Sequence, residues 1–126
     1  MARILLVDDE ESIVTTLSTL LRAQGYSTAS ALGGEAAKDL IMSQQFDLMI
    51  SDIRMSPVDG MELLKLAHDH CPTMPVIMLT AYGQVETAIE ALQLGAFDYV
   101  KKPFKAEELI DTVKRALESR DYMTKD

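Results

Sequence analysis

Short runs of apolar residues alternate five times with longer stretches in which apolar residues recur every three or four positions. The longer stretches have the period of amphipathic helices. Three of the short runs are continuously apolar, as strands buried on both faces of a parallel sheet are. We therefore predict five strands, each followed by a helix. The predicted strands lie at residues 4–7, 26–29, 48–50, 76–79 and 97–100.

Five strand–helix units in a row predict an α/β fold with a single five-stranded parallel sheet. Right-handed crossovers place the helices on both faces of such a sheet. The run at 26–29 is the least apolar, so we expect that strand at an edge. A length of 126 residues suits one domain, which we assign to residues 1–118. The polar segment 119–126 is either a fraying helix end or the start of a linker.

The composition limits the binding partners and the cellular compartment that we expect for this protein. A net charge of −8 argues against direct binding to nucleic acid or to an anionic membrane surface. Cys71 is the only cysteine, so no internal disulfide is possible and a reducing compartment is expected. No apolar stretch approaches the ~20 residues that span a bilayer. We predict a cytoplasmic protein that contacts neither membrane nor nucleic acid.

Polar residues of complementary chemistry stand at the ends of four of the five predicted strands. Parallel strands bring their carboxyl ends to one edge of a sheet, where the ligands of open α/β sheets bind. Three carboxylates, one hydroxyl group and one ammonium group are therefore expected to converge. These residues are Asp8, Asp9, Asp52, Thr80 and Lys102.

This set of groups indicates phosphoryl transfer to a protein carboxylate. Three neighbouring carboxylates repel one another, and one lysine cannot balance them. A hard divalent cation can, and Mg²⁺, with Mn²⁺ as the alternative, prefers oxygen ligands and is often held by carboxylates and a phosphate. Asp52 could then act as a nucleophile toward phosphorus. Lys102 would add a positive charge, and the Thr80 hydroxyl could donate to a phosphate oxygen.

Each of these residues also has a simpler interpretation. An Asp between a strand and a helix, as Asp8 or Asp9 would be, often caps the helix. Thr80 alone suits a cap or turn, and Lys102 alone suits a solvated surface. For Asp52, the loop to Gly60 is too long for simple capping. Together, the simpler interpretations require four coincidences.

Two other functional classes share parts of the pattern. A magnesium-dependent phosphohydrolase also places an Asp nucleophile after a strand, but it needs an acid two residues further on as proton donor. Asp52 is followed by Ile53 and Arg54, so that spacing is poor. A flavodoxin-like cofactor module needs a loop rich in Gly, Ser or Thr after the first strand. The acids at residues 8–11 would instead repel a flavin phosphate.

The strand ends carry four motifs, which are Val7-Asp8-Asp9-Glu10, Asp52 followed by Gly60, Leu79-Thr80-Ala81, and Lys102-Pro103-Phe104. In this order they resemble the receiver domains of two-component response regulators, and the resemblance covers Arg3 to Leu117. Within that family, the stretch from Thr80 to Val100 is most similar to the receivers of enhancer-binding transcription activators.

The resemblance implies a strand order of 2-1-3-4-5. It also implies phosphotransfer to Asp52 from a histidine kinase or a phosphotransfer protein. It assigns Mg²⁺ directly to Asp9 and Asp52, with Asp8 acting through water. The backbone carbonyl of Arg54 would be a further ligand. Steady turnover of a substrate is not expected of such a domain.

The resemblance further assigns roles after phosphorylation. Thr80 and Lys102 would hold phosphate oxygens. Thr80 and Tyr99 would form a switch that alters the face made by the fourth helix, the fifth strand and the fifth helix. We also expect Arg54 and Tyr82 to flank the phosphate and to slow its hydrolysis.

The subtype implies an output domain that regulates transcription within a longer parent protein. A phosphorylation-dependent homodimer is a further expectation. One position departs from the family pattern, because Ser56 stands where Pro is usual, four residues after Asp52, and Pro57 follows it. We expect the chemistry to be kept and the geometry of this loop to differ.

Overall fold

A computed structural model describes residues 2–81 and 84–123, with side chains described to residue 121. Five strands form one parallel sheet in the order β2-β1-β3-β4-β5, which confirms the predicted fold class and the edge position of the second strand. The strands are β1 (Arg3–Asp8), β2 (Ser27–Leu32), β3 (Leu48–Asp52), β4 (Val76–Thr80) and β5 (Asp98–Lys101). The helices are α1 (Glu11–Ala23), α2 (Gly34–Ser43), α3 (Gly60–His70), α4 (Val85–Gln93) and α5 (Ala106–Met123).

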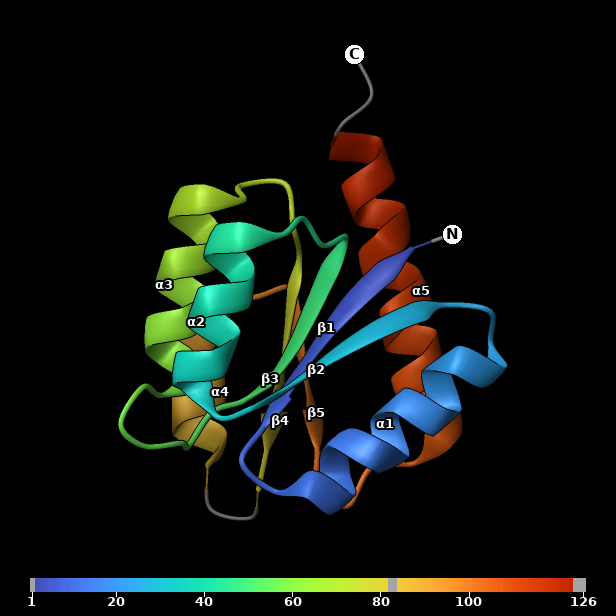
Figure 1. The fold of residues 1–126 in the computed structure, drawn as a ribbon, viewed down its shortest axis with the longest axis horizontal. Helices are drawn as coiled ribbons and strands as arrows, with labels where there is room; N and C mark the ends of the chain where they lie inside the picture. Colours follow the sequence, from blue (N-terminus) through green and yellow to red (C-terminus); the bar gives the residue numbers. More distant parts are fainter. Residues whose placement is uncertain (1, 82–83, 124–126) are drawn as a thin grey trace.

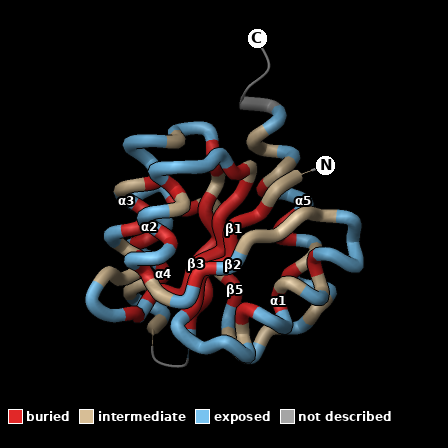
Figure 2. The backbone as a smooth tube through the Cα atoms, in the orientation of Figure 1, coloured by how far each residue is buried: buried red, intermediate tan, exposed pale blue. Residues whose placement is uncertain are grey.

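The helices cover both faces of the sheet. Figure 1 shows α2, α3 and α4 on one face and α1 and α5 on the other. Each face of the sheet forms its own apolar cluster with the helices that cover it. β1, β3 and β4 run through the centre as the most buried part of the chain, while β2 and β5 at the edges are more exposed (Figure 2). β3 and β4 are buried at every residue, which explains why their sequences carry no polar alternation.

β2 extends three residues beyond its predicted end at residue 29, because pairing with the neighbouring strand β1 continues that far. It pairs with β1 in parallel register from Arg3↔Ser27 to Asp8↔Leu32. The ladder of backbone hydrogen bonds to β1 holds small and polar residues in the sheet, although their side chains give no apolar pattern. The predicted end of this strand is therefore wrong, while its place in the sheet is confirmed.

α5 continues to Met123, five residues past the predicted domain boundary at residue 118. Arg120 Nη2 lies 3.1 Å from Asp47 Oδ1, and Asp47 Oδ2 accepts a hydrogen bond of 2.7 Å from the backbone N of Arg3. These contacts join the end of α5 to the beginning of β1. The division of the chain at residue 118 stays a prediction.

None of the described helices combines the length and the apolar character needed to cross a membrane.

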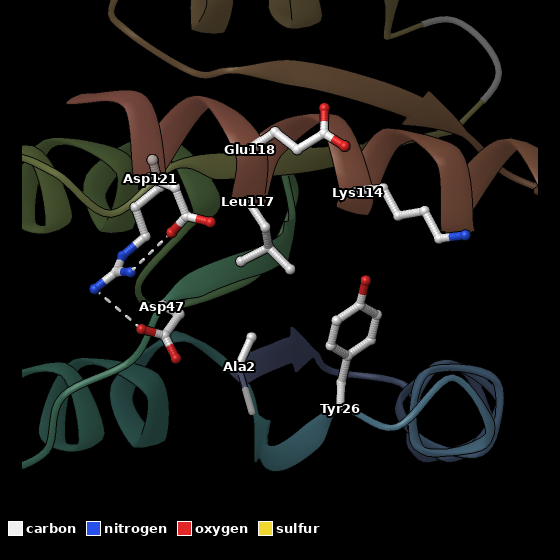
Figure 3. A pocket seen from close by; sticks show the side chains of 8 residues that line it. Ala2, Tyr26, Asp47, Lys114, Leu117, Glu118 and Asp121 are labelled. Carbon is white, nitrogen blue, oxygen red and sulfur yellow. Dashed lines mark ion pairs between the residues drawn. The ribbon is translucent and has the colours of Figure 1, made fainter. Parts of the chain in front are cut away.

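A hollow of about 450 Å³ lies beside this contact, at the amino ends of the strands. Figure 3 shows Tyr26 and Leu117 facing one another across it, with Asp47 at one side. Asp47 forms its ion pair with Arg120 there. The polar residues named from the sequence lie at the opposite, carboxyl ends of the strands. The hollow is therefore separate from the predicted site. Its lining consists of Ala2, Tyr26, Asp47, Lys114, Leu117, Glu118, Arg120 and Asp121.

Candidate functional site

Buried polar residues gather at the carboxyl ends of the central strands. Of the five polar or charged residues that are buried in the described part of the chain, only Thr112 lies elsewhere. Apolar strands that are covered on both faces exclude water up to their last residues, so polar groups at their ends are desolvated. The other four are Asp8 at the end of β1, Ser51 and Asp52 at the end of β3, and Thr80 at the end of β4.

Lys102 joins two of these strand ends. Its Nζ lies 2.9 Å from Asp8 Oδ2 and 3.3 Å from Asp52 Oδ2. The backbone N of Lys102 donates a 2.7 Å hydrogen bond to the carbonyl of Thr80. This bond fixes the residue just past the end of β5, so that the side chain reaches across β4 to β3 and β1. The structure thus brings the side chains of Lys102, Asp8 and Asp52 together and bonds the backbone of Lys102 to that of Thr80, while the roles assigned to these residues stay predictions.

Burial and the charges of neighbouring groups together shift the pKa values of Asp52 and Lys102. Burial raises the pKa of Asp52, the negative charge of Asp8 raises it further, and Lys102 only partly opposes the effect. Burial would lower the pKa of Lys102, but its hydrogen bond to Asp8 and the charge of Asp52 outweigh burial and raise it. Two buried carboxylates thus share one ammonium group, and a net negative charge is left at the strand ends.

The loop after β1 adds two more carboxylates. Carboxylate oxygens of Asp8, Asp9 and Glu10 all lie within 4.8 Å of one another, and Asp9 and Glu10 are exposed. Asp8 Oδ1 accepts a 3.0 Å hydrogen bond from the backbone N of Glu10, ahead of the first residue of α1. Asp8 therefore orders the loop and does not cap the helix. The sequence analysis gave Glu10 no role, although its place in a run of four acidic residues was a sign that it could belong to the site.

These groups have the chemistry of a site for a hard divalent cation. Mg²⁺ prefers carboxylate oxygens and retains several waters, so it can use exposed ligands such as Asp9 beside buried ones. Asp52 is not in the cluster of three acids, but the charges of Asp8 and Asp9 both act on it. The residues present therefore fit Mg²⁺, with Asp9 on the solvent side and Asp52 on the buried side.

Gly60 sets the position of the Asp52 backbone. Its backbone N donates a 2.8 Å hydrogen bond to the carbonyl of Ile53. A Cβ atom at Gly60 would lie 2.2 Å from the carbonyl oxygen of Asp52. Helix α3 therefore begins directly against the end of β3, and Asp59 caps it by accepting a hydrogen bond from the backbone N of Glu62. Within the intervening loop, the Ser56–Pro57 peptide bond is cis.

Thr80 and Tyr99 project from the same face of the sheet. Tyr99 pairs with Met78 across β4 and β5, and both pack in the cluster under α2, α3 and α4. Thr80 is two residues after Met78, and side chains two apart in a strand share a face. Of the other two residues named from the sequence, Arg54 is exposed two positions after Asp52, and Tyr82 lies outside the described residues.

Residues 4–114 match the family model of the response regulator receiver domain. Among curated proteins, the chain is 47% identical over 116 residues to regulatory protein AtoC of Escherichia coli (strain K12), covering 92% of this chain and 25% of that protein. It is 45% identical over 114 residues to the transcriptional regulatory protein ZraR of the same organism, covering 90% and 26%. The chain thus spans about a quarter of the length of these relatives.

Solved structures agree with this match. A response regulator receiver domain protein from Clostridium thermocellum has a TM-score of 0.91 at 30% identity, covering 98% of this chain and 100% of that one. NtrX from Brucella abortus, in complex with ADP, has a TM-score of 0.93 at 35% identity, covering 97% of this chain and 28% of that one. The fold, the residues at the strand ends and all three comparisons indicate the same family. The chain belongs to the response regulator receiver domains.

Proposed function

We propose that the chain accepts a phosphoryl group on Asp52 in a reaction that depends on Mg²⁺. The observation that carries this proposal is the position of the Lys102 ammonium group between the buried carboxylates of Asp8 and Asp52. A buried carboxylate beside a fixed cation is oriented by that cation. The same cation can later attract the oxygens of a bound phosphoryl group.

The donor would be a phosphohistidine of a histidine kinase or of a phosphotransfer protein. An oxygen of Asp52 forms a bond to phosphorus as the phosphorus–nitrogen bond breaks, and the electron pair of that bond stays on the imidazole nitrogen. Lys102 neutralises charge on the transferred group, and the Thr80 hydroxyl donates to one of its oxygens. No steady substrate turnover is expected, because the product remains attached to the chain.

The metal would be held by Asp9 and Asp52, by the backbone carbonyl of Arg54 and, through water, by Asp8. Bound Mg²⁺, or Mn²⁺ in its place, would neutralise charge on the phosphoryl oxygens. Support comes from the three acids whose oxygens lie within 4.8 Å of one another. We also propose that Arg54, exposed beside Asp52, shields the phosphate from water. The same role proposed for Tyr82 concerns a residue outside the described part of the chain.

The signal would leave the site through Thr80 and Tyr99. Thr80 moving toward the phosphoryl group would open space on the face where Tyr99 packs, so that Tyr99 could rotate inward. The face formed by α4, β5 and α5 would then change. We propose that this face controls a transcriptional output domain and a phosphorylation-dependent homodimer. The names of AtoC and ZraR as regulatory proteins, and their four-fold greater length, support an output domain.

Mass spectrometry after incubation with acetyl phosphate and Mg²⁺ tests the proposal. We expect a gain of one phosphoryl group in the unaltered chain and in Asp39→Asn, a control at an exposed position on α2. Asp52→Asn should gain none, and omission of Mg²⁺ with a chelator should prevent the gain. A phosphoryl group on Asp52→Asn, or none on the unaltered chain, would contradict the assignment.

A further inference from the structure

Ala81 and Gln84 are joined by two hydrogen bonds directly after β4. The backbone N of Ala81 donates to the side-chain Oε1 of Gln84 at 2.8 Å. The backbone N of Gln84 donates to the carbonyl of Ala81 at 3.2 Å. Gln84 is also the N-cap residue of α4, but its side chain caps no amide of the helix and points back to the residue after Thr80.

The direction of the Ala81 amide follows from its neighbours. The carbonyl of Leu79 faces β3, because it accepts a hydrogen bond of 3.3 Å from the backbone N of Ile53. The carbonyl of Thr80 faces the opposite way and accepts from Lys102 at 2.7 Å. Backbone groups alternate in this manner along a strand. The next amide, that of Ala81, is therefore directed toward β3, whose last residue is Asp52.

We propose that Gln84 is a positioning residue that competes with the phosphoryl group for the Ala81 amide. In the unphosphorylated domain its Oε1 accepts this hydrogen bond. A phosphoryl oxygen on Asp52 then takes its place, and Gln84 is released. An anionic oxygen accepts a hydrogen bond about twice as strongly as a neutral carbonyl, so the exchange favours the phosphorylated state. The inference rests on the proposed phosphorylation of Asp52.

The exchange would connect the chemistry to α4. Gln84 supplies the first carbonyl of this helix, which accepts a 3.0 Å hydrogen bond from the backbone N of Ala88. A change at Gln84 is therefore a change in the first turn of α4. The same helix carries large apolar side chains on its exposed surface, at Val85, Ile89 and Leu92. Gln84 would thus link a hydrogen bond at the site to the orientation of these side chains.

The test is the affinity of the domain for beryllofluoride, a mimic of the phosphoryl group, in saturating Mg²⁺. Removal of the competing acceptor in Gln84→Ala should tighten binding by about three- to tenfold, the range expected for one neutral hydrogen bond. Gln84→Asn, whose amide is one methylene shorter, should change the affinity in the same direction. Gln93→Ala, at the exposed end of α4, is the matched control and should bind like the unaltered chain.

A second readout detects the hydrogen bond itself. In the unphosphorylated domain, the Ala81 amide of Gln84→Ala should exchange its hydrogen faster than that of Gln93→Ala. Addition of beryllofluoride should shift the Ala81 amide resonance in both variants. Unchanged or weaker binding by Gln84→Ala and Gln84→Asn would overturn the role of Gln84 alone. Failure of the unaltered chain to bind beryllofluoride, or equal binding by Asp52→Asn, would overturn the proposed function as well.

Discussion

At the scale of single residues, the site is arranged at the expense of stability. Lys102 is shared by Asp8 and Asp52, and both carboxylates are buried. Burying a charge is unfavourable unless it is fully paired, and one ammonium group cannot pair fully with two carboxylates. Such a site is suited to a further cation, whose positive charge would offset the excess negative charge of the two carboxylates.

Asp52→Asn should make the domain more stable in the absence of Mg²⁺. The pKa of Asp52 is raised in the folded state, so its contribution to stability is fully present below about pH 4 and is lost as the pH rises through the folded pKa. Asn does not titrate and avoids this loss. We therefore expect the free energy of unfolding at pH 7 to be higher in Asp52→Asn than in the unaltered chain.

Urea unfolding at pH values between 3 and 8 would measure this difference, which should disappear toward the acidic end. Asp39→Asn provides the control, because Asp39 is exposed on α2. If Asp52→Asn were less stable at every pH, attraction to Lys102 would outweigh the burial of Asp52, and our interpretation of the site would be wrong.

Gly60→Ala should damage the site through the backbone. The new Cβ would lie 2.2 Å from the Asp52 carbonyl oxygen and 2.8 Å from the Cα of Ile53, and neither atom can move without shifting β3. We expect a loss of about 2 kcal/mol, typical of overpacking, and slower phosphorylation by acetyl phosphate. Gly25→Ala is the comparison, because its Cβ would meet nothing within 4 Å although φ is +93°. It should lose ~1 kcal/mol and keep its phosphorylation rate.

At the scale of elements, the end of α5 depends on a contact distant in sequence. The two carboxylate oxygens of Asp47 hold the backbone N of Arg3 at 2.7 Å and the guanidinium of Arg120 at 3.1 Å. Arg120→Gln should remove the second contact, so amides from Glu118 to Asp121 should exchange faster with solvent. Because the pair is partly exposed, we expect the global stability to fall by less than ~1 kcal/mol.

Hydrogen exchange read by NMR would measure the effect residue by residue. Lys114→Gln is the matched control, since Lys114 lines the same hollow and forms no ion pair among the described residues. Equal protection of the last turns in both variants would show that helix propensity, and not the Asp47 contact, holds the end of α5.

The same elements show how far the sequence predicts this structure. β1, β3 and β4 were predictable because strands covered on both faces must be apolar, and their ends located Asp8, Asp52 and Thr80. The last residues of β2 were missed because pairing with β1 holds them in the sheet. The helical end of α5 was left open because its polar residues are held by Asp47, which is 73 positions before Arg120 (120 − 47).

Contacts within loops were equally hidden from the sequence. The approach of Glu10 to Asp8 and Asp9, and the hydrogen bond between Ala81 and Gln84, depend on backbone conformation and not on an apolar period. A pattern of residue types therefore locates which strands carry the chemistry. It does not show which loop residues complete the site.

At the scale of the whole molecule, the candidate functional site and the contact that fixes the end of α5 lie at opposite ends of the sheet. The carboxyl ends hold the buried charges, while the amino ends hold the Asp47 contact that fixes the end of α5. The proposed phosphorylation would therefore act at the end of the sheet opposite to the contact that anchors the end of α5. The chain also carries a net charge of −8, so cations can stabilise it either by binding at the site or by screening the net charge.

Mg²⁺ should stabilise the folded chain by binding, beyond its effect as an electrolyte. A ligand that binds only the folded state adds RT ln(1 + [L]/Kd), which is about 2.7 kcal/mol at one hundred times Kd. Screening of the net charge also stabilises, but it depends on ionic strength and not on the identity of the salt. Thermal unfolding in MgCl₂ and in NaCl at equal ionic strength separates the two, with Asp9→Asn and Asp52→Asn as variants that should lose the specific part. Equal melting temperatures in the two salts would mean that the acids at the strand ends only repel one another, and the chemistry proposed for Asp52 would then lack its metal.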